Sequence, residues 1–244
     1  MRAITRSLRL VLASAGAAVV VGDINSHGAE QTAKQIIADG GKAIALGADT
    51  TDKAQVDALV DRAVSEFGRI DIMCNVAGIG YAKQVVDITE ADFDRVVAIN
   101  VKGVLFGCQA ALKHMIPQKS GSIVNVASTA VDMPVMTQAL YGMTKTAVAF
   151  LSKTLGHEVG AHGIRVNATA PGATPTNFGS FRYPDGNVDE AREKAYFDML
   201  TQGTPLGFIG EAIDQAMLIL FLVSPAARWA TGNVWRVNGG QSRA

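Results

Sequence analysis

The sequence predicts an α/β fold in which a parallel sheet is covered by helices on both faces. Short apolar runs of strand length alternate along the chain with longer stretches whose apolar residues recur at helical spacing, which is typical of βαβ units. The strand-like runs are apolar almost throughout, as expected for strands buried on both faces. With 244 residues, 48% of them hydrophobic, the chain suits one domain, 1–244, with a large core.

The expected elements follow one another along the whole chain. Strands are expected at Ala17–Gly22, Ala43–Gly47, Ile70–Asn75, Ser122–Ala127, Ile164–Ala168 and Val234–Val237. Helices are expected at 26–39, 53–67, 89–115, 138–160 and 211–223, and an amphipathic helix at about Thr5–Ser14 precedes the first strand. Because no internal repeat, low-complexity tract or linker interrupts this pattern, we expect a single domain.

Charge and cysteine content argue against several classes of function. Lys+Arg and Asp+Glu balance at 22 each, so neither nucleic acid nor an anionic membrane surface is an expected partner. Cys74 and Cys108 are too few for a disulfide framework and fit a reducing compartment. Neither these cysteines nor the 4 scattered histidines have the spacing of a metal site, so no metal is expected.

The N-terminus has some features of a secretory signal. Arginines precede the apolar stretch LVLASAGAAVVVG, and a small residue, Ala15, stands where a signal peptidase would cut. The alternative is the amphipathic helix of Thr5–Ser14 followed by Gly16 and the first strand. We favour the helix, which places the protein in the cytoplasm. No charge-free stretch reaches the length of a membrane span.

The stretch QALYGMTKTAVAFLSKTL (138–155) contains a candidate acid–base site. Tyr141 and Lys145 lie four residues apart and therefore on one face of the predicted helix. A lysine ammonium there is expected to lower the pKa of the phenol from its usual value of about 10, so that it can exchange a proton with an alcohol oxygen. Ser128, which ends the strand-like run SIVNVAS, can hydrogen-bond the same oxygen. The alternative is a packed tyrosine beside an exposed lysine.

Further motifs stand in a fixed order around these residues. In chain order they are AAVVVGD (17–23), KAIALGAD (42–49), DIMCNVAG (71–78), VVAINVKGV (96–104), HGIRVNATAPGATPT (162–176) and TGNVWRVNGG (231–240). With this order and spacing, residues 4–240 resemble the short-chain dehydrogenase/reductase family, although Val76 replaces the second asparagine of its Asn-Asn-Ala-Gly segment. The resemblance implies a Rossmann-like, doubly wound parallel sheet.

The resemblance also implies a dinucleotide cofactor. Asp23 matches the acidic residue that accepts hydrogen bonds from the adenosine ribose and repels the 2′-phosphate of NADP, so NAD is expected in preference to NADP. The residues that the resemblance assigns to cofactor binding are Asp23, Ile24, Asp49, Thr50, Asn75, Ala77, Gly78, Tyr141, Lys145, Pro171, Gly172, Thr174 and Thr176. The alternatives are that the two aspartates cap helices and that the glycines only make turns.

The sequence departs from the family at its start. Family members begin with a strand followed by Thr-Gly-x-x-x-Gly-x-Gly, whereas here Ile4 and Thr5 align with the last two positions. We therefore expect the first strand to be missing, together with the glycine loop that lets a helix N-terminus approach the pyrophosphate. Three explanations stay open: a natural start further upstream, a rearranged fold that closes the gap or borrows a strand, and a truncated relative that binds dinucleotide weakly or not at all.

As the resemblance implies, the reaction is reversible hydride transfer between the nicotinamide ring and a secondary alcohol or ketone. The implied catalytic residues are Asn100, Ser128, Tyr141 and Lys145. Tyr141 is the general acid or base, Lys145 holds the ribose, Ser128 orients the substrate oxygen, and Asn100 holds a water of a proton relay. The alternatives are a non-catalytic oligomer partner and an NADP-linked ketoacyl reductase.

In the family, an insertion after the Pro-Gly turn covers the substrate, and residues 178–210 stand in that place. The insertion combines a loop at 179–187 with the charged helical stretch VDEAREKAYFDMLTQ; a surface excursion without ligand contact is the alternative. Substrate contacts are expected from Ser128, Met133, Tyr141, Phe178 and Phe181. Aromatic residues and methionine in this region favour an apolar or cyclic substrate. A homotetramer is expected, with a dimer second.

Overall fold

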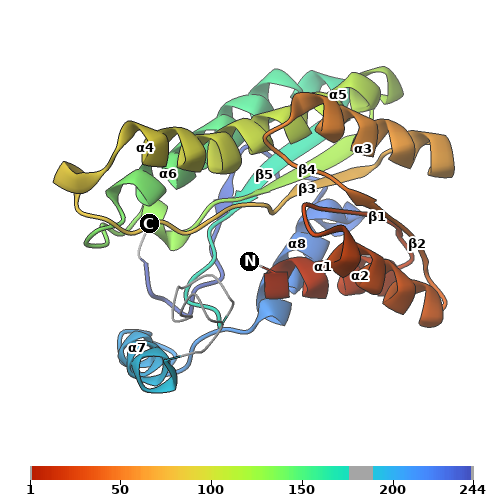
Figure 1. The fold of residues 1–244 in the computed structure, drawn as a ribbon. Helices are drawn as coiled ribbons and strands as arrows, with labels where there is room; N and C mark the ends of the chain where they lie inside the picture. The colour runs from red at the N-terminus through yellow and green to blue at the C-terminus, as the bar shows by residue number, and fades with distance from the viewer. Residues whose placement is uncertain (1, 176–188, 243–244) are drawn as a thin grey trace.

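The computed structural model describes residues 2–175 and 189–242 of the chain, with helices on both faces of parallel β-structure (Figure 1). The strands are β1 (Ala18–Asp23), β2 (Lys42–Gly47), β3 (Ile72–Asn75), β4 (Gly121–Val126), β5 (Ile164–Thr169) and β6 (Val234–Trp235). Each lies where a strand was predicted, and each described pairing is parallel. The predicted α/β fold class is therefore confirmed.

The strands form two sheets, and the single sheet expected from the alternation is interrupted. β1 pairs with β2 alone, while the other four strands follow one another in the order β3-β4-β5-β6. The edge of β1 that faces away from β2 therefore has no partner strand among the described residues. The Gly22 carbonyl, one residue before Asp23, instead accepts a hydrogen bond of 2.6 Å from the Arg9 guanidinium. A side chain thus satisfies a backbone group that a neighbouring strand would otherwise pair.

Two layers of helices enclose the strands (Figure 1). One layer contains α1 (Arg2–Ser14), α2 (Ser26–Ala38) and α8 (Ala212–Val223), and the other contains α3 (Lys53–Phe67), α5 (Gly103–Gln118) and α6 (Ala139–Glu158). The first layer forms one hydrophobic core with both sheets, because Val21 of β1 and Val124 of β4 belong to the same buried cluster. The two sheets are therefore held together through their helices. α7 (Glu190–Gln202), the helix predicted within the insertion, lies away from both sheets.

The helix expected at 89–115 is present as three consecutive segments. α4 (Glu90–Val97) begins at a capping box formed by Thr89 and Asp92, a π-helical turn follows at Ala98–Lys102, and α5 continues to Gln118. Among the described helices, the run Glu90–Gln118 is long and apolar enough to cross a membrane. A core helix has the same properties, and α5 buries Val104 and Met115 completely or nearly so.

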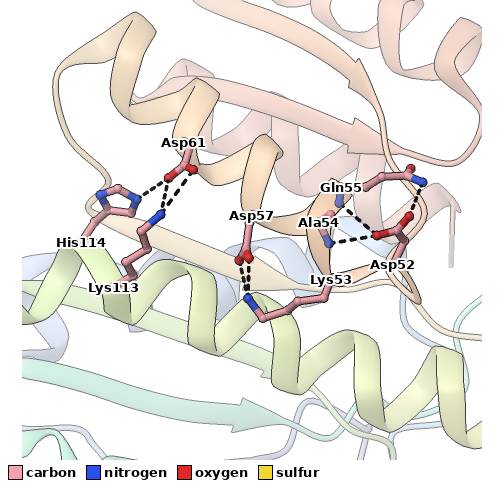
Figure 2. Close-up of polar contacts among 8 residues, drawn as sticks. All are labelled: Asp52, Lys53, Ala54, Gln55, Asp57, Asp61, Lys113 and His114. Atoms are coloured by element: carbon pink, nitrogen blue, oxygen red, sulfur yellow. Dashed lines mark hydrogen bonds and ion pairs between the residues drawn. The ribbon is translucent and has the colours of Figure 1, made fainter.

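The helices after β1 and β2 begin at capping residues other than Asp23 and Asp49. The Asn25 side chain caps α2. The Asp52 carboxylate accepts hydrogen bonds from two amides in the first turn of α3, at 2.9 and 3.3 Å (Figure 2). The alternative in which Asp23 and Asp49 act as helix caps is therefore wrong, and both carboxylates need another explanation.

Polar contacts also join α3 to α5 on the outer surface (Figure 2). Asp61 of α3 accepts from Lys113 at 3.2 Å and lies 2.8 Å from the His114 ring nitrogen. Exposed pairs of this kind contribute at most about 1 kcal/mol each. The burial of Val56 and Val60 beneath α3 therefore contributes more to holding this helix beside α5.

Candidate active site

Tyr141 and Ser128 meet at the C-terminal end of β4. Ser128 follows the strand and begins a short helical turn, in which its hydroxyl accepts a hydrogen bond from the Ala130 amide at 3.2 Å. Tyr141 lies in the first turn of α6, is only 6% exposed, and is hydrogen-bonded to the Ser128 side chain. The two hydroxyls predicted to share a substrate oxygen are therefore in contact.

Lys145 lies one turn further along α6 and is 1% exposed. Its ammonium donates a hydrogen bond of 2.8 Å to the Val126 carbonyl and lies 5.8 Å from the centroid of the Tyr141 ring. An ammonium has three donors, and no acidic partner for this one is found among the described residues. The alternative with an exposed lysine is thus wrong, and the buried charge lacks a counter-charge.

The ionisation of these groups differs from the expectation. Burial raises the pKa of Tyr141 to about 12; the Ser128 hydrogen bond acts in the opposite direction, and Tyr196 of α7 raises the pKa further. Burial lowers the pKa of Lys145 to about 8. The prediction that Lys145 lowers the pKa of Tyr141 is therefore wrong for this structure, because loss of hydration disfavours both charged forms. At neutral pH the phenol keeps its proton.

Asn100 occupies the π-helical turn between α4 and α5 and is completely buried. Its carbonyl oxygen accepts from the Ile79 amide at 2.8 Å, and its amide group donates to the Ile79 carbonyl at 3.0 Å and to Thr144 at 3.2 Å. Asn100 thus ties the loop after β3 to α6. A π-helical turn commonly marks a functional site. The expected role in holding a water stays a prediction.

The two aspartates expected near the adenosine lie at the C-terminal ends of β1 and β2. Asp23 accepts from the Asn25 amide at 3.1 Å through one oxygen, and its other oxygen lies 3.6 Å from the Arg9 guanidinium. Asp49 accepts from the amide and hydroxyl of Thr51, each at 2.8 Å. Ligands of open α/β folds bind at these strand ends. Next to the aspartates, Ile24 is 74% exposed and Thr50 is partly buried.

The side chain of Asn75 points into the core. Its amide donates to Asn125 at 2.8 Å, and Asn125 in turn donates to Ser152 at 2.9 Å. The Asn75 side chain is therefore committed to the core, and the predicted approach of a ligand to its backbone stays a prediction. Ala77 and Gly78, the small residues that follow, are exposed and partly buried, respectively, as an approach of ligand to the backbone requires.

The Pro-Gly turn lies after β5 and beside Ser128. The Pro171 carbonyl accepts from the Thr129 amide at 3.1 Å, and the Thr174 hydroxyl donates to the Gly172 carbonyl at 3.2 Å. A Cβ added to Gly172 would lie 2.6 Å from the backbone of Asn238, so glycine is required there. Met133, expected to contact substrate, is 39% exposed. Thr176, Phe178 and Phe181 lie outside the described residues.

Sequence reasoning missed two contributors to this region. They are Arg9 of α1 and the Arg236–Asp132 ion pair. No sequence signal links Arg236 to Asp132, because they are 104 positions apart. The arginines of α1 resemble the positive start of a secretory signal, and this pattern contains no information on a contact with Asp23. Within the described part of the chain, no group of His, Cys, Asp or Glu side chains is arranged to hold a metal ion.

The chain is similar to known oxidoreductases over nearly its whole length. A family model described as Enoyl-(Acyl carrier protein) reductase matches residues 2–242. An uncharacterized oxidoreductase of Methylorubrum extorquens is 38% identical over 98% of this chain and 93% of its own length. The 3-oxoacyl-[acyl-carrier-protein] reductase of Thermotoga maritima is 34% identical over 97% of this chain and 92% of its own.

Solved structures are also similar. A 7α-hydroxysteroid dehydrogenase complexed with NADH has a TM-score of 0.89 and 32% identity, with 99% of this chain and 91% of that chain covered. A gluconate 5-dehydrogenase of Burkholderia cenocepacia, in complex with NADP and tartrate, has a TM-score of 0.88 and 31% identity, with 98% and 90% covered. The chain belongs to the short-chain dehydrogenase/reductase family. It is therefore an oxidoreductase of that type.

The donors and acceptors of this short-chain dehydrogenase/reductase fit a dinucleotide. The Lys145 ammonium is buried with one acceptor among the residues that the structure describes, and a buried donor of this kind requires further acceptors such as ribose hydroxyls. Asp23 and Asp49 add carboxylate acceptors at neighbouring strand ends. These residues would hold the two ribose groups.

An ion pair between Arg236 and Asp132 joins the loop that contains Ser128 to the C-terminal part of the chain. The Arg236 guanidinium donates to both oxygens of Asp132, at 2.6 and 2.7 Å, and Ser242 donates to the same carboxylate at 3.1 Å. The Asp132 side chain is 12% exposed. Bidentate pairs are the stronger class of charged hydrogen bond, so this pair is expected to fix the loop.

Replacing Arg236 by methionine should lower the free energy of unfolding by about 2 kcal/mol at pH 7, because Asp132 loses its charged partner. The Arg236 hydrogen bonds lower the pKa of Asp132 below its usual value of 3.8. The stabilisation is therefore fully present above pH 3.8 and is lost as the pH falls through the lower folded-state pKa. Urea denaturation at pH 7 and in the acidic range measures the difference in free energy of unfolding between the wild type and Arg236→Met. Arg228→Met, at an exposed arginine, is the control. Equal stability of the wild type and Arg236→Met at pH 7 would contradict it.

Proposed function

We propose that this protein catalyses reversible, NAD-dependent hydride transfer between a secondary alcohol and a ketone. The observation that carries the proposal is the Ser128–Tyr141 hydrogen bond beside the buried ammonium of Lys145. When bound, the dinucleotide supplies or accepts the hydride. The protein supplies positioning and control of one proton.

Each site residue has a proposed task. Tyr141 donates its proton to the carbonyl oxygen in reduction and takes it back in oxidation. Ser128 orients that oxygen and stabilises the charge that develops on it. Lys145 holds the nicotinamide ribose through the N–H donors that remain beside its hydrogen bond to the Val126 carbonyl. Asn100 positions α6 against the loop after β3. We also propose that Asn100 holds a water molecule that forms part of a proton relay.

The protonation state of Tyr141 in the free protein suits the reduction half of the reversible reaction. Tyr141, with a pKa of about 12, keeps its proton at neutral pH, and the protonated phenol is the form that a carbonyl substrate needs. Oxidation would require the tyrosinate, which this buried position disfavours.

The proposed substrate is apolar or cyclic. Met133, Val135 and Met136 lie exposed on the loop between Ser128 and α6, and this loop leads directly to Tyr141. Tyr196 of α7 is close enough to affect the pKa of Tyr141, which supports residues 178–210 as the cover of the substrate. Apolar walls with a few convergent polar groups are typical of sites for such ligands.

The test combines binding with turnover. NADH is titrated into the protein while its fluorescence is followed, and the absorbance of NADH is then measured with a panel of cyclic, steroid and aryl ketones. Micromolar binding and turnover of at least one apolar ketone are expected. Absence of NADH and NADPH binding would contradict the proposal and favour a non-catalytic oligomer partner.

An NADP-linked ketoacyl reductase is the second candidate. It is favoured by the 34% identity to the Thermotoga maritima 3-oxoacyl-[acyl-carrier-protein] reductase and by the Arg9 guanidinium at Asp23. Faster turnover of a β-ketoacyl thioester with NADPH than of any simple ketone would establish this alternative.

We further propose a cytoplasmic homotetramer, with a dimer second. Exposed apolar side chains on α5, α6 and α8, among them Leu105, Phe150 and Phe221, support assembly of copies, because solvated patches of this kind commonly mark interfaces. Light scattering coupled to size-exclusion chromatography measures the assembly, and a monomeric mass would contradict it.

A further inference from the structure

The Asp23 carboxylate is paired with a residue of a different element. Arg9 of α1 places its Nη2 3.6 Å from Asp23 Oδ2 and 2.6 Å from the Gly22 carbonyl oxygen. The side chains of Arg9 and Asp23 are 13% and 26% exposed, respectively, so solvent screens the pair less than it screens a surface pair. The carboxylate at this end of β1 therefore does not act as an isolated negative charge.

The position of Arg9 follows from the interrupted sheet. Gly22 lies on the edge of β1 that no described strand pairs, and its carbonyl oxygen needs a donor. The guanidinium supplies that donor and is thereby brought beside Asp23. A guanidinium carries five N–H groups in a fixed fork, and the two contacts described use Nη2 alone. Through its other N–H groups, on a side chain that is 13% exposed, Arg9 would meet an anion at this strand end.

This pairing changes the charge that a dinucleotide would meet. A lone carboxylate accepts hydrogen bonds from the ribose hydroxyls of NAD and repels the 2′-phosphate of NADP, whereas an arginine nearby accommodates that phosphate. Asp23 retains its acceptor atoms, but Arg9 offsets its charge. We propose that Arg9 is a specificity-determining residue, which lets the adenosine end of the site accept NADP(H) as well as NAD(H). This inference rests on the proposed function.

The direct test is Arg9→Met, which keeps an apolar stem and removes the charge. Dissociation constants of NADH and NADPH are measured by fluorescence titration of the full chain without substrate. The NADPH constant should rise roughly tenfold, because like-charge repulsion by Asp23 is then uncompensated, while the NADH constant should change by less than about threefold. Lys34→Met, which removes an exposed charge from the neighbouring α2, should leave the ratio of the two constants unchanged.

A second variant covers the case in which Arg9→Met does not fold, since the Gly22 carbonyl would lose its donor. Asp23→Asn leaves Arg9 in place without its counter-charge. It should lower the NADPH dissociation constant roughly tenfold and raise that of NADH, because the guanidinium is then free to bind the 2′-phosphate.

The outcomes separate this inference from the proposed function. If the folded variants bind NADH but the ratio of the NADPH and NADH constants stays that of the wild type, Arg9 does not set specificity and the inference is overturned while the proposed function stands. If the wild type binds neither nucleotide, the proposed function fails and this inference fails with it.

Discussion

Replacing Tyr141 by phenylalanine is expected to lower kcat for ketone reduction about a thousandfold, the largest effect of any single substitution in this chain. The reason is specific to the hydroxyl, which is the only proposed proton donor that touches Ser128. General acid catalysis contributes about 10²- to 10⁴-fold to a rate. The measurement is steady-state turnover of NADH with the best ketone of the panel.

The same variant should retain its cofactor affinity and its stability. Phenylalanine keeps the ring in its buried position at 6% exposure, and the lost hydrogen bond is worth about 1 kcal/mol. Tyr81→Phe, which removes the hydroxyl of a partly buried tyrosine outside the proposed site, is the matched control and should keep kcat within about twofold. If Tyr141→Phe retained more than a tenth of the wild-type kcat, Tyr141 would not be the proton donor.

The second large effect is expected for Lys145→Met, which should lose turnover and gain stability. The ammonium is 1% exposed and has no acidic partner among the residues described. Removing it takes away the proposed ribose donors, so NADH affinity should fall at least about tenfold, as for other charged hydrogen bonds. Stability should rise by about 1–2 kcal/mol at pH 7, because methionine fills similar space without the cost of a buried charge.

The pH dependence of the wild type follows from the same group. The pKa of Lys145 is about 8 in the folded protein, against 10.5 for an ordinary lysine. Between these values the unfolded chain binds the proton that the folded protein has released, so stability rises with pH through this window. Below about pH 8 both states are protonated and the full penalty, about 3 kcal/mol before the Val126 hydrogen bond is counted, is present.

Urea denaturation from pH 7 to 9.5 measures this difference. The wild type should gain stability across the range, and Lys145→Met should not. Lys153→Met, at an exposed position of the same helix α6, should match the wild-type curve to within about 0.5 kcal/mol. A Lys145→Met variant less stable than the wild type at pH 7 would mean that the buried ammonium is stabilised by contacts other than the single hydrogen bond to Val126.

Much of the fold could be predicted because its signals are local. The runs that became β1 to β6 are apolar over the length of a strand, and the helices between them show the periodicity of a buried face. The helix at 89–115 was expected to be regular, however, and contains a π-helical turn. That turn places Asn100 against Ile79 and Thr144, which are contacts that no local pattern specifies.

The proximity of Ser128, Tyr141 and Lys145 could be predicted from the sequence, but their ionisation could not. Helical spacing placed Tyr141 and Lys145 on one face, and the structure brings Ser128 to the same phenol. The expected lowering of the Tyr141 pKa was wrong, because burial has a larger effect than the ammonium 5.8 Å from the ring centroid. Burial depends on how α6, β4 and α7 pack, and spacing within one helix contains no information on that.

The amino-acid sequence alone specified the order of the apolar runs, the candidate residues of the site and the family of the chain. Periodicity and motif spacing depend on residues that are near neighbours in the chain. The partners of Asp23, Asp132 and Asn75 are properties of the folded chain. Arg9, Arg236 and Asn125 are brought to them by the division into two sheets and by the parallel register of the strands. Charge compensation acts through space at a few ångströms, so it is established only when distant segments pack together.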